Sequence, residues 1–186
     1  MSVIIRQGES RYIDASALAR EEGIMVEQGA SADIEIGHNL SVNLEIHLIG
    51  EGASARVWGA FRGEGDEDQQ ILLRIFQDAP KTNASVIFRA AVRDRAMSRF
   101  DALIRMGENA RGASGKLSYR ALLLSEGARA KPIPRMEILT KEVASAGHEV
   151  TVGKIDPQQL FYMQSRGLTR NQAEELIVEG FLKSVP

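Results

Sequence analysis

Apolar and polar residues alternate along most of the chain after Gly23. Between Val42 and Leu48, every second residue is apolar, and polar residues occupy the positions between them. Because successive side chains of a β-strand point to opposite faces, this period of two predicts a strand with one buried face and one solvated face.

The same pattern predicts five further strands, each short and each bounded by Gly, Asn, Asp or Ser. These strands are expected at residues 55–62, 69–77, 84–93, 98–106 and 116–124. No helical segment long enough to connect parallel strands lies between them, which argues against a doubly wound α/β sheet. The sequence therefore predicts a mainly β fold.

A Gly-Ala-Ser tripeptide recurs within this region. It begins at Gly29, returns 23 positions later at Gly52, and occurs again at Gly112, with a shorter Gly-Ala echo at Gly127. A spacing of about 20 to 25 residues suits one coil of a β-solenoid, in which small residues let the backbone turn at equivalent corners. A β-sandwich would give much the same alternation, so the pattern alone leaves both folds open.

Helix signals are clearest near the carboxy terminus. Asp156 is suited to cap a helix that begins at Pro157, and Gly167 is suited to end it. Thr169 then begins a second helix, with Gln172 placed for a capping box. The sequence thus predicts a helical hairpin at residues 156–186, after a β domain at residues 1–155.

A short helix is also expected near the amino terminus, at residues 10–22. Ala15, Leu18 and Ala19 would share one face of this helix, and Gly23 would end it. In the second helix of the hairpin, the expected apolar stripe consists of Ala173, Leu176, Ile177 and Phe181.

Composition excludes several classes of function. The 186 residues include 23 basic and 25 acidic side chains, for a net charge of −2, so neither nucleic acid nor a membrane surface is an expected partner. The sequence shows neither a secretion signal nor a run of about 18 apolar residues, and we therefore expect a soluble, cytoplasmic protein. The chain has no cysteine. Disulfides, thiolate metal sites and cysteine nucleophiles are therefore excluded.

The most distinctive motifs lie toward the carboxy terminus. They are Pro-Ile-Pro-Arg-Met-Glu-Ile at 132–138, Gly-His-Glu-Val-Thr-Val-Gly-Lys-Ile-Asp at 147–156, Leu-Phe-Tyr-Met-Gln-Ser-Arg-Gly at 160–167 and Gly-Phe-Leu at 180–182. This succession resembles the carboxy-terminal signature of the SufB/SufD family, the scaffold subunits of the Suf machinery that assembles iron–sulfur clusters. The resemblance covers roughly residues 50–183. It implies a right-handed parallel β-helix rather than a sandwich, in a shortened form.

His148 and Glu149 form the sharpest candidate site. An imidazole and a carboxylate are both ligands that iron or another transition metal accepts. In a strand, however, adjacent side chains point to opposite faces, so both can reach one ion only at a bulge or a turn. The alternative is an ordinary surface pair beside a glycine turn.

The resemblance gives these two residues a role. His148 matches a histidine found in both subunit types, and Glu149 matches a glutamate of SufB-like members, both implicated in cluster assembly at the subunit interface. The SufB cysteine that transfers sulfur has no counterpart here. The chain is therefore expected to be SufD-like and to hold no cluster by itself, although iron or a transient iron–sulfur cluster is expected in the complex.

The resemblance also implies partners. A SufC-like ATPase of the ABC type is expected to dock on the hairpin. The expected docking residues are Asp156, Leu160, Phe161, Tyr162, Ser165, Arg166, Gly167 and Phe181. A SufB-like subunit or a second copy of the chain is expected against the β-helix, because proteins seldom leave strand edges free. On this interpretation the chain is a scaffold and not an enzyme.

Two other functions stay open. One is a β-solenoid enzyme, of the polysaccharide lyase or acyltransferase type, with His148 as a general base. The other is a purely structural oligomer.

Two charged segments are weaker candidate sites. Acidic residues at 64–68 could bind a cation, but they lack the ligand register of a calcium loop. Five arginines between residues 89 and 105 could bind a phosphate or an acidic surface, but aspartates are interleaved with them. A solvated turn and a solvated face explain these segments better.

Overall fold

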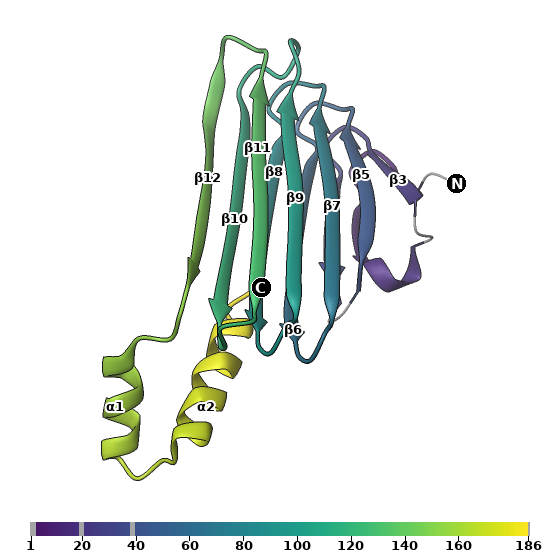
Figure 1. The fold of residues 1–186 in the computed structure, drawn as a ribbon. Helices are drawn as coiled ribbons and strands as arrows, with labels where there is room; N and C mark the ends of the chain where they lie inside the picture. The colour runs from purple at the N-terminus through teal and green to yellow at the C-terminus, as the bar shows by residue number, and fades with distance from the viewer. Residues whose placement is uncertain (1–2, 19–20, 38–39, 186) are drawn as a thin grey trace.

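The computed structural model of the chain describes residues 3–18, 21–37 and 40–185. It is a parallel β-helix with two helices at its carboxy-terminal end (Figure 1). The chain alternates between two facing six-stranded sheets, and every pairing within each sheet is parallel. The predicted solenoid is thus confirmed, and the sandwich is excluded.

The first sheet contains, in spatial order, β1 (Val3–Ile5), β3 (Glu21–Val26), β5 (Val42–Leu48), β7 (Asp68–Gln77), β9 (Met97–Met106) and β11 (Arg129–Ile138). The second contains β2 (Ser10–Asp14), β4 (Ser31–Ile36), β6 (Ser54–Gly63), β8 (Asn83–Val92), β10 (Ala113–Leu123) and β12 (Val143–Gly153). The strands lengthen along the chain, from 3 residues in β1 to 11 in β12. The solenoid therefore widens from its amino-terminal end to its carboxy-terminal end.

The Gly-Ala-Ser tripeptides mark the same corner in three coils, and in the coil between Gly52 and Gly112 this corner is Lys81, with φ 55°. Gly29, Gly52 and Gly112 all have left-handed backbones, with φ between 63° and 72°. The N–H of Gly29 donates to the carbonyl of Glu51 in the next coil at 2.9 Å, and Gly52 and Gly112 donate in the same way. A residue with a side chain is strained in this conformation, which explains why glycine recurs there.

The core lies between the two sheets and is filled by the alternating apolar residues. Phe88, Phe100 and Tyr119 stack inside it, with ring centroids 4.9 to 6.1 Å apart. The Tyr119 hydroxyl donates to Ser98 Oγ at 2.9 Å, so this buried polar group is satisfied. Burial raises the pKa of Tyr119 to about 12, which keeps the phenol neutral.

The prediction of a helix at residues 10–22 is wrong. Ser10–Asp14 form β2, which pairs with β4, and a short 3₁₀ helix, η1 (Ala15–Ala17), follows it. The Asp14 side chain caps η1 by accepting from the Ser16 N–H at 2.8 Å. Pairing with the next coil and burial of Ile13 outweigh the weak helical preference of this segment. Residues 19–20 of the expected helix lie outside the described residues.

The carboxy-terminal helices are α1 (Pro157–Ser165) and α2 (Arg170–Leu182), and the predicted caps are confirmed. The Asp156 side chain accepts from the Gln158 N–H, and Thr169 and Gln172 form a capping box. Within the described part of the chain, neither helix is long and apolar enough to cross a membrane.

The apolar stripe expected on α2 is only partly correct. Ala173 is buried and Phe181 half-buried, but Leu176 is 53% exposed, and Val178 and Leu182 are buried instead. The helix lies with this face on the outer surface of the second sheet, against Ala60 of β6 and Ala91 of β8. Packing against a sheet, and not only against α1, sets its rotation.

Candidate functional site

The last coil leaves part of the solenoid interior uncovered. Inward-facing positions of β10, such as Leu117 and Tyr119, are fully buried, whereas their register partners on β12 are exposed. The β12 partner of Tyr119 is Val150, which is 39% exposed. The inward-facing residues of this open end are Pro132, Pro134, Met136 and Ile138 on β11 and Ala146, His148, Val150 and Val152 on β12.

His148 and Glu149 lie on opposite faces of β12. His148 is in register with the buried Leu117 and therefore belongs to the inner face. Glu149 lies on the outer face, where it accepts from Arg120 Nε at 2.8 Å. The only register shift between β10 and β12 lies at Ala113, far from this pair. Within one chain, the side chains of His148 and Glu149 therefore point away from each other and do not converge on one ion.

The ligand set of the chain by itself is incomplete for iron. The sequence has no cysteine, and the described residues contain no group of three His, Asp or Glu side chains that could hold a metal ion. A metal at His148 or Glu149 would need further ligands from another subunit. A metal-binding role for these two residues remains a prediction.

The outer edge of β11 is blocked by two prolines. The N–H groups of Arg129, which begins β11, and of Leu139, just after its end, donate to the carbonyls of Ala96 and Met106 on the β9 side. Odd-numbered residues of β11 therefore face β9. Even-numbered residues direct their N–H groups to the free edge, and Pro132 and Pro134 are both even. Proline is tolerated here because the donor it lacks would point away from the sheet. The edge of β11 is thereby a poor template for another strand.

The outer edge of β12 is not blocked. The N–H groups of Ser114, near the start of β10, and of Leu124, just after its end, donate to the carbonyls of Thr82 and Val92 on the β8 side. The odd residues of β10 therefore face β12. The register of β12 then leaves the N–H and C=O groups of Ala146, His148, Val150 and Val152 directed to the free edge. Unpaired backbone groups of this kind accept a strand from another chain.

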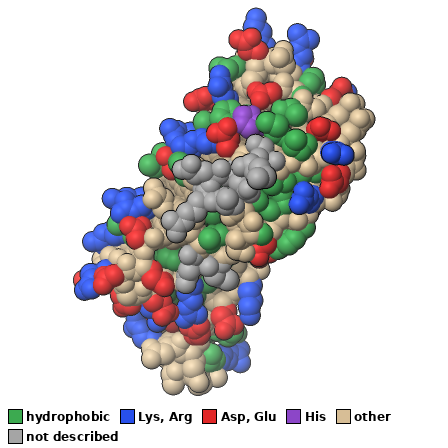
Figure 2. Space-filling view, turned by 90° about the vertical axis from the view of Figure 1, so that its right-hand side faces the viewer, with side chains coloured by type: hydrophobic (Ala, Val, Ile, Leu, Met, Phe, Trp, Pro, Cys, Tyr) green, Lys and Arg blue, Asp and Glu red, His purple; other side chains and the backbone are tan. Residues whose placement is uncertain are grey.

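The opposite end of the solenoid differs. Figure 2 views it and shows side chains of both charges interspersed with hydrophobic ones. The strands at this end are short, and the inward-facing Ile5 and Ile13 are already buried. Exposed apolar side chains there include Ile4 and Tyr12, which is 58% exposed. The wide end is thus the one with an uncovered interior.

The residues expected to hold an ATPase lie on α1, at its two ends and near the end of α2. Phe161 and Tyr162 are exposed on α1, at 73% and 58%. Arg166 covers the Tyr162 ring at 5.3 Å, and Ser165 Oγ donates to the Tyr162 carbonyl at 2.7 Å. Leu160 lies on the same helix, and Gly167 with φ 96° ends it.

Two of the expected residues meet in a groove at the base of the hairpin. Asp156 and Phe181 both line this groove, which has a volume of about 580 Å³. Its other walls include Leu122, Met163 and Leu176. The groove therefore joins α1, α2 and the end of β10, and most of its lining is apolar.

Two ion pairs fix α2 to the second sheet. Both terminal nitrogens of Arg62 on β6 donate to Glu175, one of them at 2.7 Å, and Arg93 after β8 donates to Glu174 at 2.8 Å. Residues 62 and 175 are 113 positions apart. No local sequence signal links such distant residues, and sequence reasoning did not identify these four as functional.

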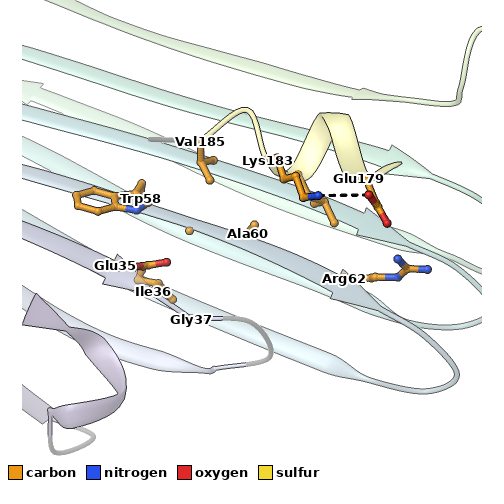
Figure 3. Close-up of a pocket in the computed structure, with 11 residues that line it drawn as sticks. Glu35, Ile36, Gly37, Trp58, Ala60, Arg62, Glu179, Lys183 and Val185 are labelled. Carbon is orange, nitrogen blue, oxygen red and sulfur yellow. Dashed lines mark hydrogen bonds and ion pairs between the residues drawn. The ribbon is translucent and has the colours of Figure 1, made fainter. Parts of the chain in front are cut away.

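A pocket of about 430 Å³ lies where the carboxy-terminal end of α2 meets β4 and β6. Figure 3 shows Trp58 and Glu35 on one side of it and Arg62 on the other, with Val185 above. Its charged groups are already engaged: Lys183 with Glu179 at 3.3 Å, Arg62 with Glu175, and Glu35 with the Tyr12 hydroxyl. A molecule in this pocket would therefore make mainly van der Waals contacts, because these charged groups already have partners.

Acid is expected to loosen α2. The hydrogen bond from Arg62 holds the pKa of Glu175 below its ordinary value of 4.5. A lowered folded-state pKa gives stability that is present above pH 4.5 and is lost as the pH falls through the lower value. Because Glu175 is 41% exposed, the effect should stay below about 1 kcal/mol.

Trp58, the only tryptophan of the chain, lines the pocket beside α2 and reports this change by its emission. We expect an emission change below pH 4.5 that is reduced in Glu175→Gln. An identical acid response in wild type and variant would contradict the prediction.

Comparison with known proteins agrees with this architecture. The model of the family described as SUF system FeS cluster assembly, SufBD core domain, matches residues 19–181. The iron–sulfur cluster assembly protein SufD of Bacillus subtilis (strain 168) is 26% identical over 181 residues, which cover 97% of this chain and 41% of that protein.

Mycobacterial relatives are similar to the same degree. An iron–sulfur cluster assembly SufBD family protein of Mycobacterium leprae (strain TN) is 30% identical over 156 residues, covering 80% of this chain and 40% of that protein. One of Mycobacterium tuberculosis (strain ATCC 25618 / H37Rv) is 31% identical over 158 residues, covering 80% and 39%. The chain thus spans about two-fifths of the length of these relatives. With a family match over most of its length, the chain belongs to the SufBD core family of the SUF iron–sulfur cluster assembly system.

Proposed function

We propose that the chain is a SufD-like scaffold subunit in a Suf-type complex for iron–sulfur cluster assembly. The observation that carries this proposal is the open carboxy-terminal end, where β12 has a free, unblocked edge and the interior is uncovered. Family membership supplies the class of process. Because the chain has no cysteine, thiolate ligands for the cluster would come from its partner.

The partner at this end is a SufB-like subunit or a second copy of the chain. A strand added to β12 would satisfy the outward-facing N–H and C=O groups of Ala146, His148, Val150 and Val152. The same contact would cover the exposed inner face of β11 and β12. His148 would then lie at the joint between the two interiors, where it could act with groups of the partner on iron or a transient cluster as cargo.

A SufC-like ATPase of the ABC type is the proposed second partner. Phe161 and Tyr162 give α1 an exposed aromatic surface of the kind that anchors protein interfaces. The ion pairs of α2 tie the hairpin to the second sheet. Movement of a bound ATPase would therefore reach the sheet through α2. We place the complex in the cytoplasm.

Co-purification from native cytosol tests these partners. The tagged chain is expected to recover an ABC-type ATPase and a SufB-like subunit. Tyr162→Ser should lower recovery of the ATPase at least about fivefold, as expected for an aromatic anchor. Tyr12→Ser is the matched control, because Tyr12 is equally exposed, at 58%, but lies on β2, at the end of the second sheet opposite β12. Recovery of the chain with itself alone would support the purely structural oligomer instead.

The enzyme alternative receives less support from the site. A general base needs convergent polar groups and a place for substrate beside it. The inward-facing neighbours of His148 on β12 are Ala146 and Val150, which are apolar, and Glu149 is on the other face. Activity toward pectin-like or acyl-donor substrates that disappears in His148→Ala would favour the enzyme over the scaffold.

A further inference from the structure

Arg89 occupies an unusual position on the outer face of the second sheet. It lies in register with Arg120 of β10, so two cations sit in directly opposite positions on neighbouring strands. Such a pair is destabilising unless other charges compensate it. Arg120 is paired with Glu149, whereas Arg89 forms no ion pair with any carboxylate among the described residues.

On one side, Arg89 contacts the end of α2. Its Nε donates to Ser184 Oγ at 3.3 Å, and its guanidinium lies 5.9 Å from the centre of the Phe181 ring. The carboxy-terminal end of a helix carries partial negative charge, which also favours a cation at this place. Arg89 therefore helps to hold the end of α2 on the sheet.

On the other side, Arg89 reaches toward β12. Its Nη1 donates to Ser118 Oγ at 3.4 Å, and Ser118 is the register partner of Glu149. Arg120 contacts only the Oε1 atom of Glu149, and Oε2 has no hydrogen-bond partner among the described residues. Burial and the charge of Arg120 lower the pKa of Arg89, while the charge of Glu149 opposes this shift. Arg89 is thus within electrostatic reach of Glu149.

We propose that Arg89 couples α2 to β12 because Ser184 and Phe181 on one side compete with Glu149 on the other for its guanidinium. When the end of α2 lifts from the sheet, the guanidinium is free to bind Glu149 Oε2. When Glu149 is lost, Arg89 stays with α2. The two effects must be equal in free energy, because coupling between two sites is reciprocal.

The functional meaning of this coupling rests on the proposed function, in which a partner moves the hairpin and β12 carries the subunit contact. Arg89 would then be a positioning residue that changes the charge around Glu149 as α2 moves. The physical coupling itself belongs to the chain alone and needs neither partner nor iron.

Hydrogen exchange on the purified chain tests the coupling. Phe181→Leu with Ser184→Ala removes the partners of Arg89 on α2 but keeps apolar packing. We expect the β12 amides that bond to β10, at residues 147, 149, 151 and 153, to exchange about threefold more slowly, because Arg89 now reinforces Glu149. In the Glu149→Gln background the same double change should leave these rates unaltered. Conversely, Glu149→Gln alone should slow exchange at residues 179–184 by a similar factor.

Asp33→Asn is the matched control, because Asp33 also pairs with an arginine of the neighbouring strand, Arg56, but neither contacts α2. It should leave residues 179–184 unchanged. A β12 response that is absent, or that persists without Glu149, would overturn the proposal. Since this measurement uses no ATPase or second subunit, its failure would leave the co-purification result standing, and the reverse also holds.

Discussion

Val150→Pro is expected to weaken pairing along β12 strongly while leaving the fold intact. The N–H of Val150 points to the free edge, so proline removes a donor that the isolated chain does not use. Prolines already occupy equivalent edge positions on β11, where Pro132 and Pro134 block the edge without breaking the strand. Association with a second copy or a SufB-like subunit should weaken roughly a hundredfold, about 2.8 kcal/mol. The free energy of unfolding should change by less than about 1 kcal/mol.

Analytical ultracentrifugation of the chain, and its recovery with a SufB-like subunit, measure the association, and urea denaturation measures the stability. Val150→Ala is the control that keeps the donor and loses only apolar area. Thr151→Pro provides the opposite pattern, because the Thr151 N–H faces β10 and its loss should destabilise the strand by about 3 kcal/mol. Undiminished association of Val150→Pro would show that β12 is not the pairing edge.

Phe88→Ala should cost about 3–5 kcal/mol of unfolding free energy, which is a large part of the stability of an ordinary domain. Phe88 is 1% exposed and stacks on both Phe100 and Tyr119, with centroids 5.5 and 6.1 Å away. Its ring also covers the backbone of Gly59, where an added Cβ would lie only 2.7 Å from it. The space left by alanine is therefore walled by a stacked core that has little freedom to collapse.

The midpoint of urea denaturation measures this loss. Phe76→Ala is the control, because Phe76 lies on the outer face of β7 and stacks on the partly exposed His47, 4.8 Å away. It should cost no more than about 1 kcal/mol. Equal losses in the two variants would mean that the stack inside the solenoid is not the centre of its stability.

The middle coils were predictable because their alternation is enforced by burial. The expected strand at residues 84–93 coincides with β8 to within one residue at each end, and that at 98–106 lies inside β9. Each has one face in the dry core, so apolar residues must occupy every second position. The caps of α1 and α2 were predictable for a similar reason, since Asp156 and Thr169 satisfy backbone groups within a few residues of themselves.

The open end gave a weaker signal for a physical reason. The inner faces of β11 and β12 are not buried in the single chain, so alternation there tolerates Pro132, Pro134 and His148. The pattern alone set no strand boundaries in this region, and the family resemblance located its motifs. The separation of His148 from Glu149 followed from strand geometry, but the engagement of Glu149 with Arg120 depends on a pairing 29 residues apart.

The widening of the solenoid also limits how copies of the chain can stack. A head-to-tail contact would place the 3- and 5-residue strands β1 and β2 against the 10- and 11-residue strands β11 and β12. More than half of each long strand would then lack a partner, so this repeat is unfavourable. Head-to-tail repeats are the ones that grow into open fibres, whereas contacts between like ends close after two subunits. The taper therefore protects a chain with an exposed strand edge from polymerising.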